Sequence, residues 1–199
     1  MFFWHPFGMS VSFLFLMVQG GLLLVDEAAL LRLLCYKMEF NRSNVVAVHF
    51  YVQLLSCLCY VGGFIAIYLH KIRLGKPHFL SWHARFGLAT VISCLFFQLL
   101  FGLLMHVSVV EKTLSKLMTL PAKTKLRQFH RRSSVFSFEL GMVTTILSCY
   151  SLFVKDNFPS NAEVIIPAVA AFLALTVPIF VFKLFPARVP VITKLENNV

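Results

Sequence analysis

The sequence predicts an all-α membrane protein with five transmembrane helices. Of its 199 residues, 59% are hydrophobic, and the mean hydropathy of +0.82 is too high for a soluble domain of this length. Five runs with almost no charge reach the roughly 18 residues that a helix needs to cross a bilayer. Because lipid offers the backbone no hydrogen-bond partners, runs of this length are expected to be helical inside a membrane.

The five predicted spans follow one another with short connections. They cover residues 7–25, 44–69, 86–110, 133–154 and 164–182, and Glu139 is the one charge inside the fourth. Residues 26–34 are predicted to continue the first span as one or two amphipathic turns. Gly75 and Pro77 indicate a turn between the second and third spans. No connection is long enough for a second domain, so residues 1–199 are predicted to form a single domain.

The positive charges predict how the chain is oriented in the membrane. Consecutive spans alternate in direction, which places 5 of the 18 Lys and Arg residues on the side of the N-terminus and 13 on the other side. The side richer in Lys and Arg normally faces the cytosol, so the C-terminus is predicted to be cytosolic. Since these loops account for the formal net charge of +10, nucleic acid is not an expected partner.

Four histidines occupy equivalent places in the sequence. His5, His49, His83 and His130 each lie at or close to the start of a hydrophobic segment. Helix direction puts His5 and His83 on the non-cytosolic side, and His49 and His130 on the cytosolic side. Two neutral imidazoles on facing helices can fill both axial positions of a haem, which gives an electron-transfer centre. The alternative is that all four are interfacial residues at helix ends.

Other polar residues in or near the spans give weaker signals. His70, His78 and His106 are predicted to be solvated or interfacial. Glu139 lies nine residues after His130, which is about 180° around a helix, so it is predicted to face away from that histidine. Zinc is not favoured at either histidine pair, because neither has a Cys or carboxylate at ligand spacing.

Three short motifs and their spacing resemble the cytochrome b561 family. Residues 3–6 (Phe-Trp-His-Pro) resemble its Ser-Trp-His-Pro element, residues 81–83 its Ser-Trp-His element, and residues 123–130 its Lys-Leu-Lys-Leu-Tyr-His element. The loop of residues 70–78 is similar to that of the short, domain-only members that reduce iron with ascorbate. The resemblance extends to about residue 185, and its specific part is the 44, 34 and 47 residues between successive histidines.

This resemblance implies a membrane protein of six helices, in which four histidines hold two b haems. Haems of this family carry electrons from cytosolic ascorbate to monodehydroascorbate or ferric iron on the other side. His49 and His130 would hold the cytosolic haem, and His5 and His83 would hold the other. The first of the six helices is expected to be absent, since the His5 motif begins at residue 3, while the four-helix haem core is retained.

Cations near each predicted haem are expected to bind anionic substrates and haem propionates. By resemblance, Arg42 takes the place of a Lys that contacts ascorbate, and Arg supplies forked donors that suit planar oxyanions. Lys76 and His78 are expected to bind the electron acceptor on the other side. The basic segment around the fourth histidine contains Lys123, Lys125, Arg127, Arg131 and Arg132, of which Lys125 and Arg127 are expected to contact the donor.

Two other classes of function are open at this point. The chain could be a small transporter or channel whose histidines relay protons or bind a metal, or a haem-free assembly subunit. Paired α and β absorption bands on reduction distinguish electron transfer from both. The expected location is an endomembrane, vesicle or plasma membrane, where lipid surrounds the chain, and the sequence leaves a homodimer open.

Overall fold

The structure is a computed structural model that describes residues 2–24, 42–150 and 161–183. Within these residues every regular element is a helix, which confirms the predicted all-α class. Residues 26–34, predicted to extend the first span, lie outside the described residues. In chain order the helices are α1 (Trp4–Ser10), η1 (Val11–Leu16), α2 (Met17–Leu23), α4 (Arg42–Arg73), α5 (Trp82–Ser93), η2 (Cys94–Leu100), α6 (Phe101–His106), α7 (Ser108–Leu117), α8 (Lys123–Cys149) and α10 (Ala162–Lys183).

Among the described residues, three helical stretches are long and apolar enough to cross a membrane: Trp4–Leu23, Ser43–Arg73 and Trp82–His106. A shorter apolar stretch, Val164–Val177, lies within α10. The fourth predicted span, residues 133–154, begins inside α8, whose first turns are basic, and its last residues lie outside the described part. Five crossings therefore stay a prediction, whereas three membrane-length helices are observed.

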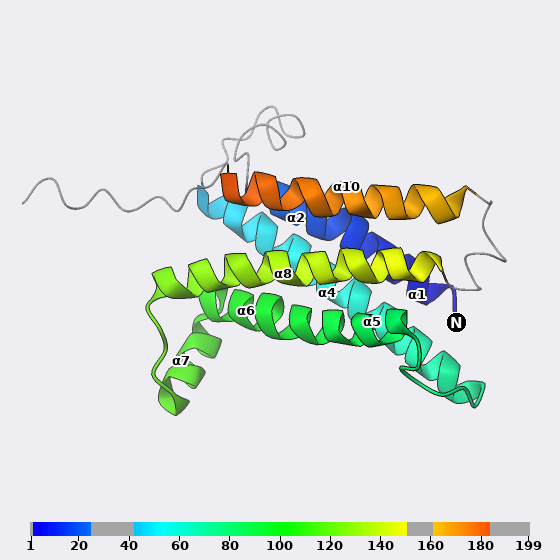
Figure 1. Ribbon diagram of the computed structural model, residues 1–199. Helices are drawn as coiled ribbons and strands as arrows, with labels where there is room; N and C mark the ends of the chain where they lie inside the picture. Colours follow the sequence, from blue (N-terminus) through cyan, green and yellow to red (C-terminus); the bar gives the residue numbers. More distant parts are fainter. Residues whose placement is uncertain (1, 25–41, 151–160, 184–199) are drawn as a thin grey trace, which may run out of the picture.

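The third predicted span, residues 86–110, begins and ends four residues later than the observed stretch, Trp82–His106. Residues 86–110 have no charge, but the helix ends at His106 because Val107 adopts an extended conformation with φ −108° and ψ 103°. Helix α7 then starts at Ser108 in a new direction, and Figure 1 shows it projecting from the end of α6. The uncharged run continues past the helix end because Val107 and the first three residues of α7, Ser108 to Val110, carry no charge.

The helices form two antiparallel pairs. In the first pair, the rod made by α1, η1 and α2 packs along α4; in the second pair, the rod made by α5, η2 and α6 packs along α8. Figure 1 shows α10 running beside α8 and α2, on the side of the bundle away from α5 and α6. The buried core lies where the two pairs meet and includes Phe13, Met17, Tyr60, Cys94 and Met142.

The predicted turn between the second and third spans is confirmed. Gly75 has φ +60°, a left-handed conformation that Gly adopts without steric cost. The amide of Lys76 donates to the Lys71 carbonyl (3.0 Å) and that of Gly75 to the Ile72 carbonyl (3.1 Å), which is the Schellman ending of a helix. Ser81 then caps α5, since its hydroxyl accepts a hydrogen bond from the Ala84 amide at 3.2 Å.

Gly8 brings the backbones of the first helix pair together. A Cβ at this position would lie 2.7 Å from the Cys59 carbonyl oxygen and 3.3 Å from the Gly63 Cα. The neighbouring atoms are main-chain atoms that cannot rotate away, so any side chain here forces α1 and α4 apart. Small residues at such contacts are how membrane helices approach closely.

We therefore expect Gly8→Ala to destabilise the protein by about 1–3 kcal/mol, the usual cost of overpacking. The measurement is the thermal unfolding midpoint of purified protein in detergent. Gly62→Ala is the matched control, because a Cβ at Gly62 meets nothing within 4 Å. Equal midpoints for the two variants would show that the close contact does not constrain the pair.

Candidate functional site

The four histidines share one hydrogen-bond arrangement. Each ring places Nδ1 within hydrogen-bond distance of a backbone carbonyl on the helix that faces it. A carbonyl oxygen can only accept, so each Nδ1 carries the proton and each neutral ring leaves Nε2 unprotonated, ready to bind a metal. The four pairs are His5 with Gly63 (3.1 Å), His49 with Gly20 (2.7 Å), His83 with Thr144 (3.1 Å) and His130 with Phe97 (3.1 Å).

These bonds are reciprocal within each helix pair. His5 of α1 bonds to α4 at Gly63, while His49 of α4 bonds to α2 at Gly20. The second pair repeats the arrangement, with His83 bonded to α8 and His130 bonded to η2. Each pair therefore carries one histidine near each of its ends, with both held by the partner helix.

The two ends of the bundle are well separated. Gly63 lies 14 residues after His49, and Thr144 lies 14 residues after His130. At a rise of 1.5 Å per residue, 14 residues span about 21 Å along a helix. The two histidines of one helix pair are therefore separated by about this distance along the bundle. The four histidines thus form two sites, one at each end, rather than one cluster.

His5 and His83 meet at one end. Their ring centroids are 6.1 Å apart and their planes make an angle of 71°. Two metal–imidazole bonds of about 2 Å each would place two ring centroids roughly 6 Å apart, so the spacing suits two axial ligands of one iron. No group of three or more His, Cys, Asp or Glu residues that could hold a metal ion occurs among the described residues. A haem needs only two protein ligands, and the pair fits that requirement.

His49 and His130 line one cavity at the other end, with a volume of about 790 Å³. Pockets that hold compact organic ligands range over about 300–1,000 Å³. The walls are mainly apolar and come from both helix pairs, with Met17, Phe50, Leu99 and Phe138 among them. An apolar slot between helices that also offers two imidazoles fits a flat, largely apolar cofactor such as haem.

Arg127 is the predicted substrate residue that the structure places in this cavity. Its side chain lines the wall, together with Arg131. Lys125, two residues earlier on α8, is exposed. Arg42 is the first residue of α4, so its backbone is at the same end, while its side chain lies outside the described residues. Figure 1 shows that α4 and α8 begin, and α6 ends, at this one end of the bundle.

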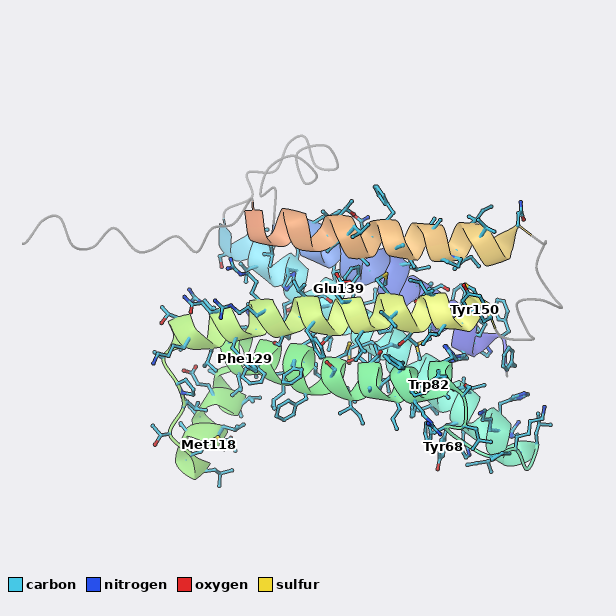
Figure 2. All side chains as sticks on the ribbon, in the orientation of Figure 1. Tyr68, Trp82, Met118, Phe129, Glu139 and Tyr150 are labelled. Carbon is cyan, nitrogen blue, oxygen red and sulfur yellow. The ribbon has the colours of Figure 1, made fainter. Side chains whose placement is uncertain are left out.

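The predicted acceptor residues lie at the opposite end. Lys76 is exposed in the turn after α4. His78 stacks on Tyr68 with ring centroids 4.5 Å apart, and Figure 2 shows Tyr68 near the end of α4. Lys71 Nζ donates to the Pro77 carbonyl at 3.2 Å and holds this loop against the helix. The loop is thus an ordered part of the end that carries His5 and His83.

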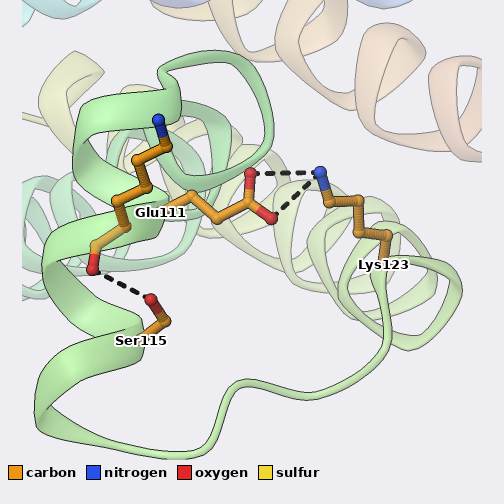
Figure 3. Close-up of polar contacts among 4 residues, drawn as sticks. Glu111, Ser115 and Lys123 are labelled. Atoms are coloured by element: carbon orange, nitrogen blue, oxygen red, sulfur yellow. Dashed lines mark hydrogen bonds and ion pairs between the residues drawn. The ribbon is translucent and has the colours of Figure 1, made fainter.

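Lys123 has a structural partner of its own. Its Nζ lies 2.9 and 3.0 Å from the two carboxylate oxygens of Glu111, as Figure 3 shows. This ion pair ties α7 to the start of α8 and offsets the Lys123 charge. Of the basic segment expected around His130, Arg127 and Arg131 line the cavity, whereas Lys123 pairs with α7.

His106 is a cavity residue that sequence reasoning did not place in the site. The prediction put it at an interface or in solvent, and it is indeed exposed, but it also lines the cavity beside His49 and His130. Its ring centroid is 5.1 Å from that of Phe50. The available signal was its position near the end of the third span, which brings it to the same end as the start of the second.

Glu139 is absent from the lining of this cavity, as its predicted direction required. It lies near the middle of α8 in Figure 2. One of its carboxylate oxygens is buried without a hydrogen-bond partner among the described residues.

Comparison with known proteins gives one consistent result. The family described as eukaryotic cytochrome b561 matches residues 4–155. The chain is 33% identical over 152 residues to transmembrane reductase CYB561D2 of Bos taurus, which covers 76% of this chain and 62% of that protein. It is 31% identical over 162 residues to the Mus musculus protein of the same name, covering 81% and 67%.

A more distant relative is the probable transmembrane reductase CYB561D1 of Homo sapiens, 30% identical over 93 residues, or 47% of this chain and 38% of that protein. The chain spans 62% of the length of the bovine relative. No solved structure matches the chain. The matched residues 4–155 include all four histidines of the two sites.

Proposed function

We propose that this chain, which belongs to the eukaryotic cytochrome b561 family, carries electrons across a membrane through two b haems. The electrons come from cytosolic ascorbate and pass to monodehydroascorbate or a ferric chelate on the other side. In this proposal the protein is an ascorbate-dependent transmembrane oxidoreductase. The observation that carries it is the shared Nδ1–carbonyl bond of His5, His49, His83 and His130.

That bond has a specific consequence for metal binding. Ligating histidines almost always donate their second ring N–H to a carbonyl, carboxylate or water, which sets the tautomer and raises the basicity of the ligating nitrogen. Four histidines that merely capped helices at an interface would have no reason to share this bond. The pattern therefore favours two bis-histidine haem sites, His5 with His83 and His49 with His130.

A haem held by two of these histidines would supply a one-electron carrier that does not bind oxygen. The protein holds the rings, excludes water with apolar walls and presents cations to anions. Arg127 and Arg131, in the wall of the His49–His130 cavity, are suited to bind haem propionates or ascorbate, because a guanidinium donates in a planar fork. Arg42 and Lys125 are proposed to attract the same donor, and Lys76 and His78 the acceptor.

The orientation in the membrane makes a separate prediction. Asn41-Arg42-Ser43 is a glycosylation sequon, and Asn41 itself lies outside the described residues. We place it on the cytosolic side with the start of α4, so we expect it to remain unmodified when the protein is made in a secretory membrane. The check is the electrophoretic mobility of the protein before and after glycosidase treatment. A shift that Asn41→Gln removes would invert the proposed orientation and put the donor site outside the cytosol.

The function is tested with purified protein in sealed vesicles. We expect paired α and β absorption bands when ascorbate is added, and reduction of a ferric chelate trapped on the opposite side. Vesicles that lack the protein are the control for leakage. A purified, folded protein with no haem spectrum would contradict the proposal. The alternative functions, a transporter or a haem-free assembly subunit, would then remain. Reduction of the haem without reduction of the trapped ferric chelate would support haem binding and contradict electron transfer across the membrane.

A further inference from the structure

Two buried pairs of serine hydroxyls join the helices of each pair. In the first helix pair, the Ser12 and Ser56 hydroxyl oxygens are 2.7 Å apart; in the second, those of Ser93 and Ser137 are 2.6 Å apart. Ser12, Ser56 and Ser137 have no exposed surface, and Ser93 is 7% exposed. A hydroxyl moved into an apolar interior needs a partner, and each of these has one on the facing helix.

The first serine pair also links backbone to backbone. The Ser12 hydroxyl lies 3.0 Å from the Ser56 carbonyl oxygen, and the Ser56 hydroxyl lies 3.4 Å from the Ser12 carbonyl oxygen. Each serine therefore reaches the main chain of the other helix as well as its side chain. Such a contact resists sliding of one helix along the other more than a contact between two flexible side chains does.

The serine pairs lie between the two histidine sites. Ser12 follows His5 by seven residues, Ser56 follows His49 by seven, and Ser137 follows His130 by seven. On each side of a helix pair, the carbonyl that accepts a hydrogen bond from the facing helix's histidine comes 14 or 15 residues after that side's own histidine. The first serine pair is thus about halfway between the two Nδ1–carbonyl bonds of its helix pair.

We propose that the Ser12–Ser56 pair is a positioning device that sets the register of the first helix pair and, through it, the Nδ1–carbonyl bonds of His5 and His49. A slide of α4 along the first rod by one residue, about 1.5 Å, would stretch or tilt both bonds together. Ser93 and Ser137 have the same role in the second pair. This inference rests on the proposed function, because it concerns how two haem-ligating rings are held.

The first pair depends on its serines more than the second. Ser93 and Ser137 are joined only through their hydroxyls, and the second pair has an additional link between the Thr90 and Thr144 hydroxyl oxygens at 3.0 Å. Thr144 also provides the carbonyl that holds His83. Loss of the Ser93–Ser137 contact therefore leaves a register constraint in place, whereas no such threonine pair supports Ser12 and Ser56 in the described hydrogen bonds.

Positioning and simple stabilisation predict different results for a double variant. Removing one hydroxyl takes the closest hydrogen-bond partner, at 2.7 Å, from the buried hydroxyl that remains, so Ser12→Ala and Ser56→Ala should each lower the unfolding midpoint. Removing both leaves no unpaired hydroxyl, so the double variant should recover much of that loss. If the serines set the register, the haem potentials must stay shifted in the double variant although the stability recovers.

The measurements are the midpoint potentials of both haems, by spectroelectrochemical titration, and the thermal unfolding midpoint of the same samples. A weaker Nδ1 bond makes the ligating nitrogen less basic, which disfavours ferric iron and raises the potential. We expect the redox equilibrium of both haems to shift three- to tenfold towards the ferrous state in the double variant. This corresponds to about 30–60 mV at 59 mV per tenfold for one electron.

Thr176→Val is the matched control, because the Thr176 hydroxyl bonds to the Phe172 carbonyl of its own helix at 2.8 Å and to no other helix in the part of the chain that the structure describes. It should move neither potential. The Ser93→Ala, Ser137→Ala double variant should give a smaller shift than the first. Unchanged potentials in the Ser12, Ser56 double variant, or a shift at only one haem, would overturn the inference. The proposed function would still stand if the wild-type protein shows the haem spectrum. A wild-type protein without haem would instead refute the proposed function itself.

Discussion

Replacing His83 with alanine is expected to remove one haem and leave the other intact. The Nε2 atom of His83 is proposed to be one of two axial ligands at the end where its ring faces His5 at 6.1 Å. Alanine has no ligating atom, and one histidine alone leaves a five-coordinate, weakly held haem. His49→Ala is expected to have the same effect at the opposite end, where His130 alone would remain.

The two losses are measured as haem per protein and by redox titration. Each variant should bind about half the haem of the wild type, and the potential that remains should differ between the two variants. His70→Ala is the control, since its ring packs on Phe2 at 5.4 Å and belongs to neither pair, so it should keep both haems. Retention of full haem by His83→Ala, or loss of the same component in both variants, would refute the pairing.

Arg127→Ala is expected to slow reduction by ascorbate about ten- to a hundredfold. The guanidinium lines the cavity that holds His49 and His130, and a hydrogen bond to a charged group is worth roughly 1.5–3 kcal/mol. Ascorbate is an anion that needs this contact, whereas dithionite reduces haem without a specific site. The measurement is the rate of appearance of the reduced absorption bands with each reductant.

The control for Arg127 is Lys116→Ala, which removes an exposed cation of α7 at the same end of the bundle. It should leave the ascorbate rate close to that of the wild type, because its charge is screened by solvent and salt. Equal slowing of Arg127→Ala with both reductants would indicate damaged haem binding instead of a lost donor contact. Equal effects of the two substitutions on ascorbate alone would reduce the role of Arg127 to general surface charge.

Hydropathy alone was sufficient for the helical class, and helix direction predicted which histidines share an end of the bundle. Long uncharged runs can satisfy their backbone in lipid only as helices, and alternating direction then assigns each helix start to a side. Helix direction places His5 and His83 on one side, and in the structure their ring centroids are 6.1 Å apart. The same hydropathy placed the end of the third span four residues too late, since it does not register the extended backbone at Val107.

The register between helices was decided only by the tertiary structure. Which carbonyl accepts from His49 depends on how far α4 is displaced along α2, and no local propensity encodes a displacement between segments 29 residues apart. The meeting of Ser12 with Ser56, the contact of Gly8 with Cys59 and the place of His106 in the cavity depend on the same displacement. The sequence by itself determined that four imidazoles lie at or near the starts of membrane-length hydrophobic segments. Close packing of backbones, which is a property of pairs of helices, determined that Nδ1 of each ring faces a carbonyl and that Nε2 is left as the nitrogen proposed to bind iron.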